Sequence, residues 1–231
     1  MSLGMGCLAC EGGLMKSKFP ARPSEERARP RIRRSMLVMA CALCVACLVP
    51  ASAGAQTTQV PTSQSCVADL QPSGTPDLSG MIPVVPVSLG CYPTISQAIS
   101  VATDGSVSLP SDIQPSQITD AMLQPSSPDS TGSVVIGIDY NLSEWSGDSK
   151  VWSAGDPCTD TRSFGLAYIG DAWNDRPSSA HTYGGCDRWH HFEDRDYNGA
   201  QLVCKGPNSD EPCKHMGVLN DQTSSEKFKH A

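Results

Sequence analysis

The stretch Asn174-Asp-Arg-Pro-Ser-Ser179 returns near the C-terminus as Asn220-Asp-Gln-Thr-Ser-Ser225, with four of six residues identical. Carboxamide, carboxylate and hydroxyl oxygens on one short segment are hard ligands of the kind that calcium prefers. An ordinary turn or helix start explains either copy alone, because short polar side chains bond nearby backbone amides there. The repeat gains meaning only if a second pattern accompanies it.

A second repeat precedes each copy of the first. Residues 140–147 (Tyr-Asn-Leu-Ser-Glu-Trp-Ser-Gly) and 192–199 (Phe-Glu-Asp-Arg-Asp-Tyr-Asn-Gly) share the pattern aromatic, four residues, aromatic, one residue, glycine. This pattern repeats at an offset of 52 residues and the Asn-Asp motif at 46, in the same order. It predicts a folded hairpin in which two aromatic rings pack across a tight bend and glycine supplies an unusual backbone angle.

Short strands are predicted throughout the region that holds both repeats. Runs rich in β-branched and aromatic residues are separated there by Gly, Pro, Asp and Ser, which is the pattern of an all-β domain. Eight strands in two sets of four predict a sandwich of two Greek-key motifs. The expected strands are 134–140, 150–152, 164–169, 178–183, 188–192, 200–204, 215–219 and 225–228.

The first 55 residues predict a leader with a secretory signal peptide. A basic run at 29–34 precedes an apolar segment at 36–49 and a small-residue ending, Ala53-Gly-Ala55. The apolar segment is shorter than the roughly twenty residues of a membrane span. Cleavage is expected after Ala55. A lipoprotein anchor on a cysteine of the apolar segment competes with this interpretation, and the long leader leaves open a start at Met15 or later.

Charge and cysteine content agree with export. Eight of the 17 Lys and Arg but three of the 24 Asp and Glu precede residue 56, so the chain beyond it carries about −12. This acidity argues against nucleic acid and anionic membranes as partners, and it suits a cation or a soluble surface equally. Six cysteines follow residue 56, an even number that predicts disulfides in an exported chain. Six cysteines can pair in fifteen ways. Nearness in the sequence favours the pairs Cys66–Cys91, Cys158–Cys186 and Cys204–Cys213.

The region before the strands divides by composition. Residues 56–65 predict a flexible tether, 66–128 a small mixed segment, and 129–133 the end of a Pro- and Ser-rich linker. Apolar residues at helical spacing predict a short helix from Thr94 to about Asp104, and 118–123 a second one. The prolines among 83–93 predict at most short edge strands, because proline cannot donate to a strand ladder.

Together the two repeats resemble the βγ-crystallin superfamily in its microbial calcium-binding form, over residues 134–231. The resemblance implies an all-β sandwich of two Greek-key motifs, here preceded by the small mixed N-terminal segment. It also implies two calcium sites at one end of the sandwich, each completed by a backbone carbonyl from the hairpin of the other half. Two departures are the insertion between residues 152 and 164, which holds Cys158, and Pro177 within the first motif.

Carried over by position, the resemblance implies eight metal-site residues. The Asp and Ser residues of each motif would offer side-chain oxygens. The residue after each Asp would offer its backbone carbonyl. For the asparagine that opens each motif, the resemblance does not define whether it binds the metal directly. Ser179 and Ser225 are expected to hold the hairpins rather than contact metal. The implied site residues are Asn174, Asp175, Arg176, Ser178, Asn220, Asp221, Gln222 and Ser224.

The sequence offers little evidence for zinc binding or catalysis. His181, His190 and His191 lack zinc spacing and predict surface histidines on strands, and Glu193, Asp194 and Asp196 predict solvated charges. With no nucleophile motif or phosphate loop, the chain is not expected to be an enzyme.

The leading expectation is a secreted calcium-binding protein with a structural or stress-related role. A secreted inhibitor of metalloproteinases or a killer-toxin-like protein on the same fold is the alternative, with 152–164 and 205–212 as its candidate loops and a secreted protease as partner. A cell-wall module that binds glycan through residues 66–128 is a third interpretation.

Overall fold

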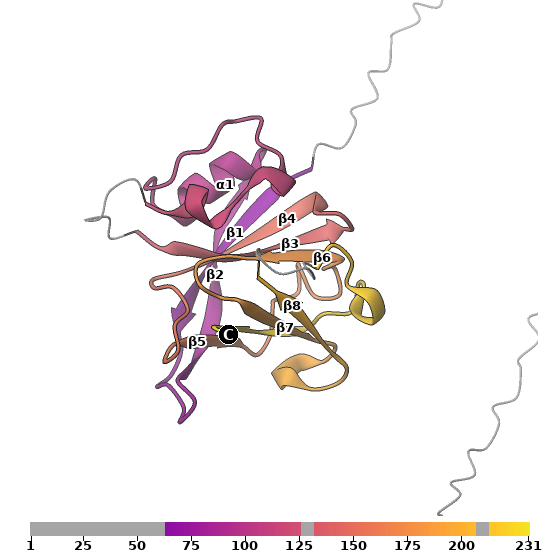
Figure 1. Ribbon diagram of the computed structural model, residues 1–231. Coiled ribbons are helices and arrows are strands. Elements are labelled where there is room, and N and C mark those ends of the chain that lie inside the picture. Colours follow the sequence, from indigo (N-terminus) through magenta and orange to yellow (C-terminus); the bar gives the residue numbers. More distant parts are fainter. Residues whose placement is uncertain (1–62, 126–131, 207–212) are drawn as a thin grey trace, which may run out of the picture. The chain divides into compact units, whose positions relative to one another are not determined.

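The computed structural model describes residues 63–125, 132–206 and 213–231, and the predicted signal peptide, most of the predicted tether and the middle of the Pro- and Ser-rich linker lie outside these residues. The described part is mostly β, with one α-helix, short 3₁₀ turns and a nine-stranded mixed sheet (Figure 1). No described helix is long and apolar enough to cross a membrane. The elements are β1 (Ser65–Pro72), β2 (Met81–Tyr92), α1 (Ile95–Ala102), β3 (Val134–Leu142), β4 (Ser146–Ala154), β5 (Ser163–Leu166), β6 (Ser179–Thr182), β7 (Arg188–Phe192), β8 (Gln201–Lys205) and β9 (Ser225–Lys229).

The strand order β6-β3-β4-β1-β2-β5-β9-β7-β8 places the N-terminal hairpin in the middle of the sheet. β1 pairs with β2 in antiparallel fashion and with β4 in parallel, and β2 pairs with β5 in parallel. β1 and β2 therefore join two groups of strands, β6-β3-β4 and β5-β9-β7-β8, into one sheet.

The prediction of at most short edge strands near residues 83–93 was wrong, because β2 is a twelve-residue strand with partners on both sides at its start. The carbonyl of Pro83 accepts a hydrogen bond from the Ser73 amide, at 2.8 Å, so Pro83 faces the β1 side. Strand backbone groups alternate in direction, so Pro86 turns its missing N–H to the other side. Pairing with β5 has already ended there, at Val84.

The predicted helix is present as α1, and Thr94 caps it by accepting a hydrogen bond from the Gln97 amide at 3.2 Å. The second predicted helix is a 3₁₀ turn, Asp120–Leu123. The buried face of α1 packs against one face of β1, β3 and β4, around Val67, Ile138 and Val151. A larger core cluster contains residues of the opposite face of these strands, among them Ala68, Ile136 and Trp152. Both faces of these strands are covered, which explains why β3 is buried almost without interruption.

Seven of the eight expected strands are present, all but β7 with shifted ends. The strand expected at 215–219 was wrong: Gly217–Leu219 is a 3₁₀ turn. The segment before it still lies along β6, because Ala180 N–H donates to the Cys213 carbonyl and Met216 N–H to the Ser178 carbonyl, each at 2.9 Å. This segment thus lies beside β6 and is hydrogen-bonded to it, in the way that β5 pairs with β9.

The three expected disulfides are all present. Cys66–Cys91 links β1 to β2, Cys158–Cys186 links the insertion after β4 to the loop before β7, and Cys204–Cys213 spans the end of β8. All three lie inside the unit formed by the chain from residue 56 onward.

Candidate functional site

Two equivalent hairpins form the framework of the candidate site. In the first, Glu144 and Trp145 have positive φ, and in the second Asp196 and Tyr197 do, with φ between 54° and 64°. Each hairpin ends on a glycine with positive φ, and a Cβ at Gly147 would collide with the Asn141 side chain. The glycine of the sequence pattern is therefore required by both conformation and space.

One serine holds each hairpin. Ser179 Oγ accepts from the Trp145 amide at 3.0 Å and donates to the Leu142 carbonyl at 2.6 Å. At the equivalent place, Ser225 Oγ accepts from the Tyr197 amide at 2.9 Å and donates to the Asp194 carbonyl at 2.6 Å. The structural role expected for these two serines is confirmed.

The two Asn-Asp motifs contact each other through reciprocal backbone hydrogen bonds. Asp175 N–H donates to the Thr223 carbonyl at 3.0 Å, and Asp221 N–H donates to the Pro177 carbonyl at 3.1 Å. Both aspartates have left-handed backbones, with φ of 59° and 55°. This exchange brings two segments 46 residues apart side by side and leaves both aspartates exposed.

Oxygens from three segments meet at the first half of the site. The Ser178 hydroxyl lies 2.9 Å from Asp221 Oδ1 and 3.1 Å from the Asn141 carbonyl oxygen. The serine is buried, whereas the aspartate is open to solvent. A carboxylate, a hydroxyl and a backbone carbonyl are all oxygen donors, which is the set that a hard cation such as calcium takes. The residues present therefore fit that ion.

The second half offers the equivalent groups but not the same contact. Ser224 is buried and Asp175 is exposed, yet no hydrogen bond joins their side chains among the described residues. The hairpin residue equivalent to Asn141 is Glu193, whose carbonyl accepts no hydrogen bond in the described part of the chain. The candidate oxygens of the second half therefore make fewer contacts with one another than those of the first half.

The remaining predicted residues orient these oxygens or present carbonyls. Asn174 Nδ2 donates to Asp175 Oδ2 at 2.6 Å, and Asn220 Nδ2 donates to Asp221 Oδ2 at 2.8 Å. Each asparagine thus holds the carboxylate beside it. Within the described ranges, no hydrogen bond uses the carbonyls of the residues at the third motif position, Arg176 and Gln222.

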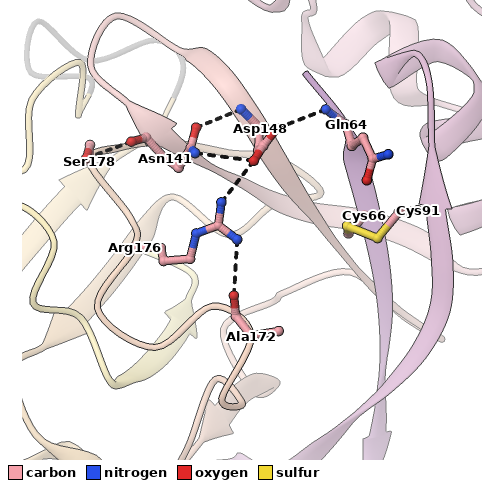
Figure 2. A network of polar contacts seen from close by, with 8 residues as sticks. All are labelled: Gln64, Cys66, Cys91, Asn141, Asp148, Ala172, Arg176 and Ser178. Carbon is pink, nitrogen blue, oxygen red and sulfur yellow. Dashed lines mark hydrogen bonds and ion pairs between the residues drawn. A yellow bond between two sulfur atoms is a disulfide. The ribbon is translucent and has the colours of Figure 1, made fainter. Parts of the chain in front are cut away.

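The Arg176 side chain breaks the equivalence of the two halves (Figure 2). Its guanidinium donates to Asp148 Oδ2 at 2.9 Å and to the Ala172 carbonyl at 3.3 Å, and lies 5.0 Å from the Trp173 ring centre. Asp148 also accepts from the Gln64 amide at 3.0 Å. A cation is therefore built into the first half, where the second has the neutral Gln222.

The expectation of surface histidines was wrong for two of the three. His181 is 7% exposed and stacks on Trp145 with ring centres 4.8 Å apart, and His191 is 0% exposed. Burial lowers the pKa of each to about 4. Side chains alternate between the two faces of a strand, and those of His181 and His191 lie on the buried faces of β6 and β7. The sequence interpretation considered only whether the histidines had zinc-type spacing, which does not indicate burial. Glu193, Asp194 and Asp196 are exposed, as expected.

Sequence reasoning also missed a buried cluster of Asp139, His191 and Glu226, which could hold a metal ion. The signal was present: Asp139 and His191 each precede the first aromatic of a hairpin at the same 52-residue offset, and Glu226 follows the hairpin serine.

Solved structures of βγ-crystallins match part of this chain. A βγ-crystallin from an archaeon matches with 18% identity and a TM-score of 0.29, over 41% of this chain and 96% of its own. A domain from Clostridium beijerinckii matches with 21% identity and a TM-score of 0.28, over 40% and 94%. One from Ciona intestinalis matches with 18% identity and a TM-score of 0.29, over 41% and 98%. No family model and no curated protein matches the chain.

These matching structures are βγ-crystallins, the superfamily that the two sequence repeats resemble. The matches support no conclusion about ligands, which are inferred below from contacts in this chain.

Proposed function

We propose that this chain is an exported calcium-binding protein whose residues 134–231 form a βγ-crystallin-like sandwich of two Greek-key motifs. The carrying observation is the reciprocal backbone exchange between Asp175 and Thr223 and between Asp221 and Pro177. It supports two sites, because it places the aspartate of each motif beside the other motif, and Asp221 contacts Ser178 directly. The first site would use Asp221, Ser178 and the Asn141 carbonyl.

The second proposed site would use Asp175, Ser224 and the Glu193 carbonyl. The carbonyls of Arg176 and Gln222 are the further candidate ligands, and Asn174 and Asn220 would orient the carboxylates. Calcium supplies a fixed positive charge that gathers these oxygens. Ligand sets whose carboxylates are exposed suit weak extracellular sites, with Kd of ~10⁻⁴ to 10⁻³ M.

The proposed role is stabilisation of the exported fold, supported by three disulfides and by sites that join the two halves. At ten times Kd, mass action at one site adds about 1.4 kcal/mol to the free energy of unfolding. The protease-inhibitor alternative gains no support from the described residues, since most of the loop 205–212 lies outside them. The glycan-module interpretation of 66–128 is weakened because β1 and β2 belong to the common sheet.

Calorimetric titration with calcium and thermal unfolding test this proposal on Asp175→Asn and Asp221→Asn. We expect each variant to lose binding heat and part of the calcium-induced rise in Tm. Asp104→Asn is the matched control, because Asp104 is an exposed aspartate with φ of 51° outside the motifs. Wild-type protein with no heat and no rise in Tm at millimolar calcium would overturn the proposal.

A further inference from the structure

Asp139, His191 and Glu226 form a cluster in the interior, separate from the surface oxygens. They lie on β3, β7 and β9, so both groups of strands contribute, and each is 0% exposed. One donor atom from each lies within 4.8 Å of the others. His191 is opposite Glu226 in the β7–β9 register. The cluster is thus fixed by the sheet itself.

Five of the six side-chain N and O atoms of this cluster make no hydrogen bond of good geometry among the described residues, although the Glu226 carboxyl lies near Asp139 and Trp189. These atoms are Asp139 Oδ1, both ring nitrogens of His191 and both carboxylate oxygens of Glu226. A buried polar group left unpaired costs ~1–3 kcal/mol, and more when it is charged. The nearest approach, His191 Nδ1 to Glu226 Oε1 at 3.4 Å, is longer than a charge-assisted hydrogen bond.

Nearby cations do not neutralise the two carboxylates. Lys150 lies opposite Asp139 in the β3–β4 register, but its ammonium is 5.2 Å from the Trp152 ring centre. No ion pair joins it to the cluster within the part of the chain that the structure describes. Asp139 and Glu226 are both 0% exposed, and an interior site strongly disfavours carboxylate charge that no cation compensates.

We propose that Asp139, His191 and Glu226 bind a divalent transition metal of the zinc type, buried between the two strand groups. Two carboxylates, one neutral imidazole and one divalent cation sum to zero charge, which removes the cost of burying the carboxylates. The metal would also partner atoms that otherwise have none. The site shares no ligand with the proposed calcium sites.

The ligand types and one ligand–ligand distance favour zinc over calcium here. Ligands about 2.1 Å from a tetrahedral zinc are about 3.4 Å apart, which is the separation of His191 Nδ1 and Glu226 Oε1. Calcium takes six or more oxygens, whereas imidazole nitrogen with carboxylates suits zinc and its neighbours. Both ring nitrogens of the buried His191 lack a hydrogen-bond partner among the described residues, so either one is available as a metal ligand.

The surroundings orient the ligands. Trp152 Nε1 donates to Asp139 Oδ2 at 2.8 Å, which leaves Oδ1 free for the metal. The Trp189 ring lies 4.6 Å from the His191 ring and restricts its rotation. Such partners behind the ligands are a regular feature of protein metal sites.

Metal analysis of the full chain tests the proposal, after reversible unfolding with disulfides intact, chelation, and refolding with or without one equivalent of Zn²⁺. We expect about one retained zinc per chain after dialysis and a higher urea midpoint than that of the metal-free protein. Refolding with Co²⁺ should give visible absorption bands of a low-coordinate site. Wild-type protein that retains neither metal and unfolds at the same midpoint with and without Zn²⁺ would overturn the inference.

Variants assign the ligands. His191→Gln and Glu226→Gln should lose the zinc and the shift in urea midpoint, whereas Asp175→Asn with Asp221→Asn should keep both. Asp139→Asn with Glu226→Gln removes both charges without changing shape, so it should fold without metal and be insensitive to zinc. Retention of zinc by this uncharged variant would contradict the assignment.

Discussion

At the scale of single residues, two positions related by the repeat carry different side chains. The third motif position is Arg176 in the first copy and Gln222 in the second. The arginine binds Asp148 in the first hairpin, and no comparable contact of the glutamine exists among the described residues. The repeat predicts equivalent oxygens, and this pair of residues makes them electrostatically unequal.

Replacing Arg176 by glutamine should therefore strengthen calcium binding at the first proposed site. The change removes a cation near the oxygens, frees the Asp148 carboxylate and copies the residue of the second motif. A unit charge about 7 Å from a divalent ion in water is worth roughly 1.2 kcal/mol, or about sevenfold in Kd. Calorimetric titration would measure it, with Gln222→Asn as the control. Unchanged or weaker calcium binding would contradict the prediction that the Arg176 charge weakens binding at the first site.

His181 should make stability depend on pH. Its pKa is about 4 when buried, against 6.5 for an unperturbed histidine, so between these values only the unfolded chain binds the proton. The contribution to stability is full above pH 6.5, falls as pH drops towards 4, and stays constant below. The total loss is about 3 kcal/mol. Urea unfolding of wild type and His181→Phe at pH 7 and 4.5 would show a smaller loss in the variant, and equal losses would contradict the prediction.

At the scale of elements, alternation and spacing predicted most strands, the helix and the hairpins, because these follow from local sequence. β2 was missed because the effect of its prolines depends on which neighbour each one faces, and that is set by distant pairing. The buried placement of His191 was missed for a related reason. Its partners, Asp139 and Glu226, come from other strands, and sequence spacing does not reveal their proximity.

Gly137 is another element-scale feature that only packing explains. It lies on β3, and a Cβ there would come within 2.7 Å of the Trp189 ring and 3.0 Å of the Phe228 ring. Gly137→Ala should therefore lower the free energy of unfolding by about 1–3 kcal/mol through overcrowding between the strand groups. Urea unfolding measures the loss. Gly155→Ala is the matched control, because a Cβ there meets nothing within 4 Å.

At the scale of the whole molecule, the N-terminal hairpin joins the two groups of strands. The repeat within 134–231 predicted the candidate surface sites because both copies lie inside one symmetric unit. The role of residues 66–92 could not be predicted, since no repeat or spacing links β1 to β4 or β2 to β5.

The central position of β1 and β2 predicts that the chain from residue 56 onward unfolds as one unit. Removing the Cys66–Cys91 disulfide by Cys66→Ser with Cys91→Ser releases a loop of 25 residues, which should cost about 3 kcal/mol. Because both strand groups pair with this hairpin, the loss should appear in a single transition. Far-UV circular dichroism and tryptophan fluorescence should give the same urea midpoint, lower than in the wild type. All four tryptophans lie beyond residue 134, so an N-terminal segment that folded separately would leave the fluorescence midpoint unchanged.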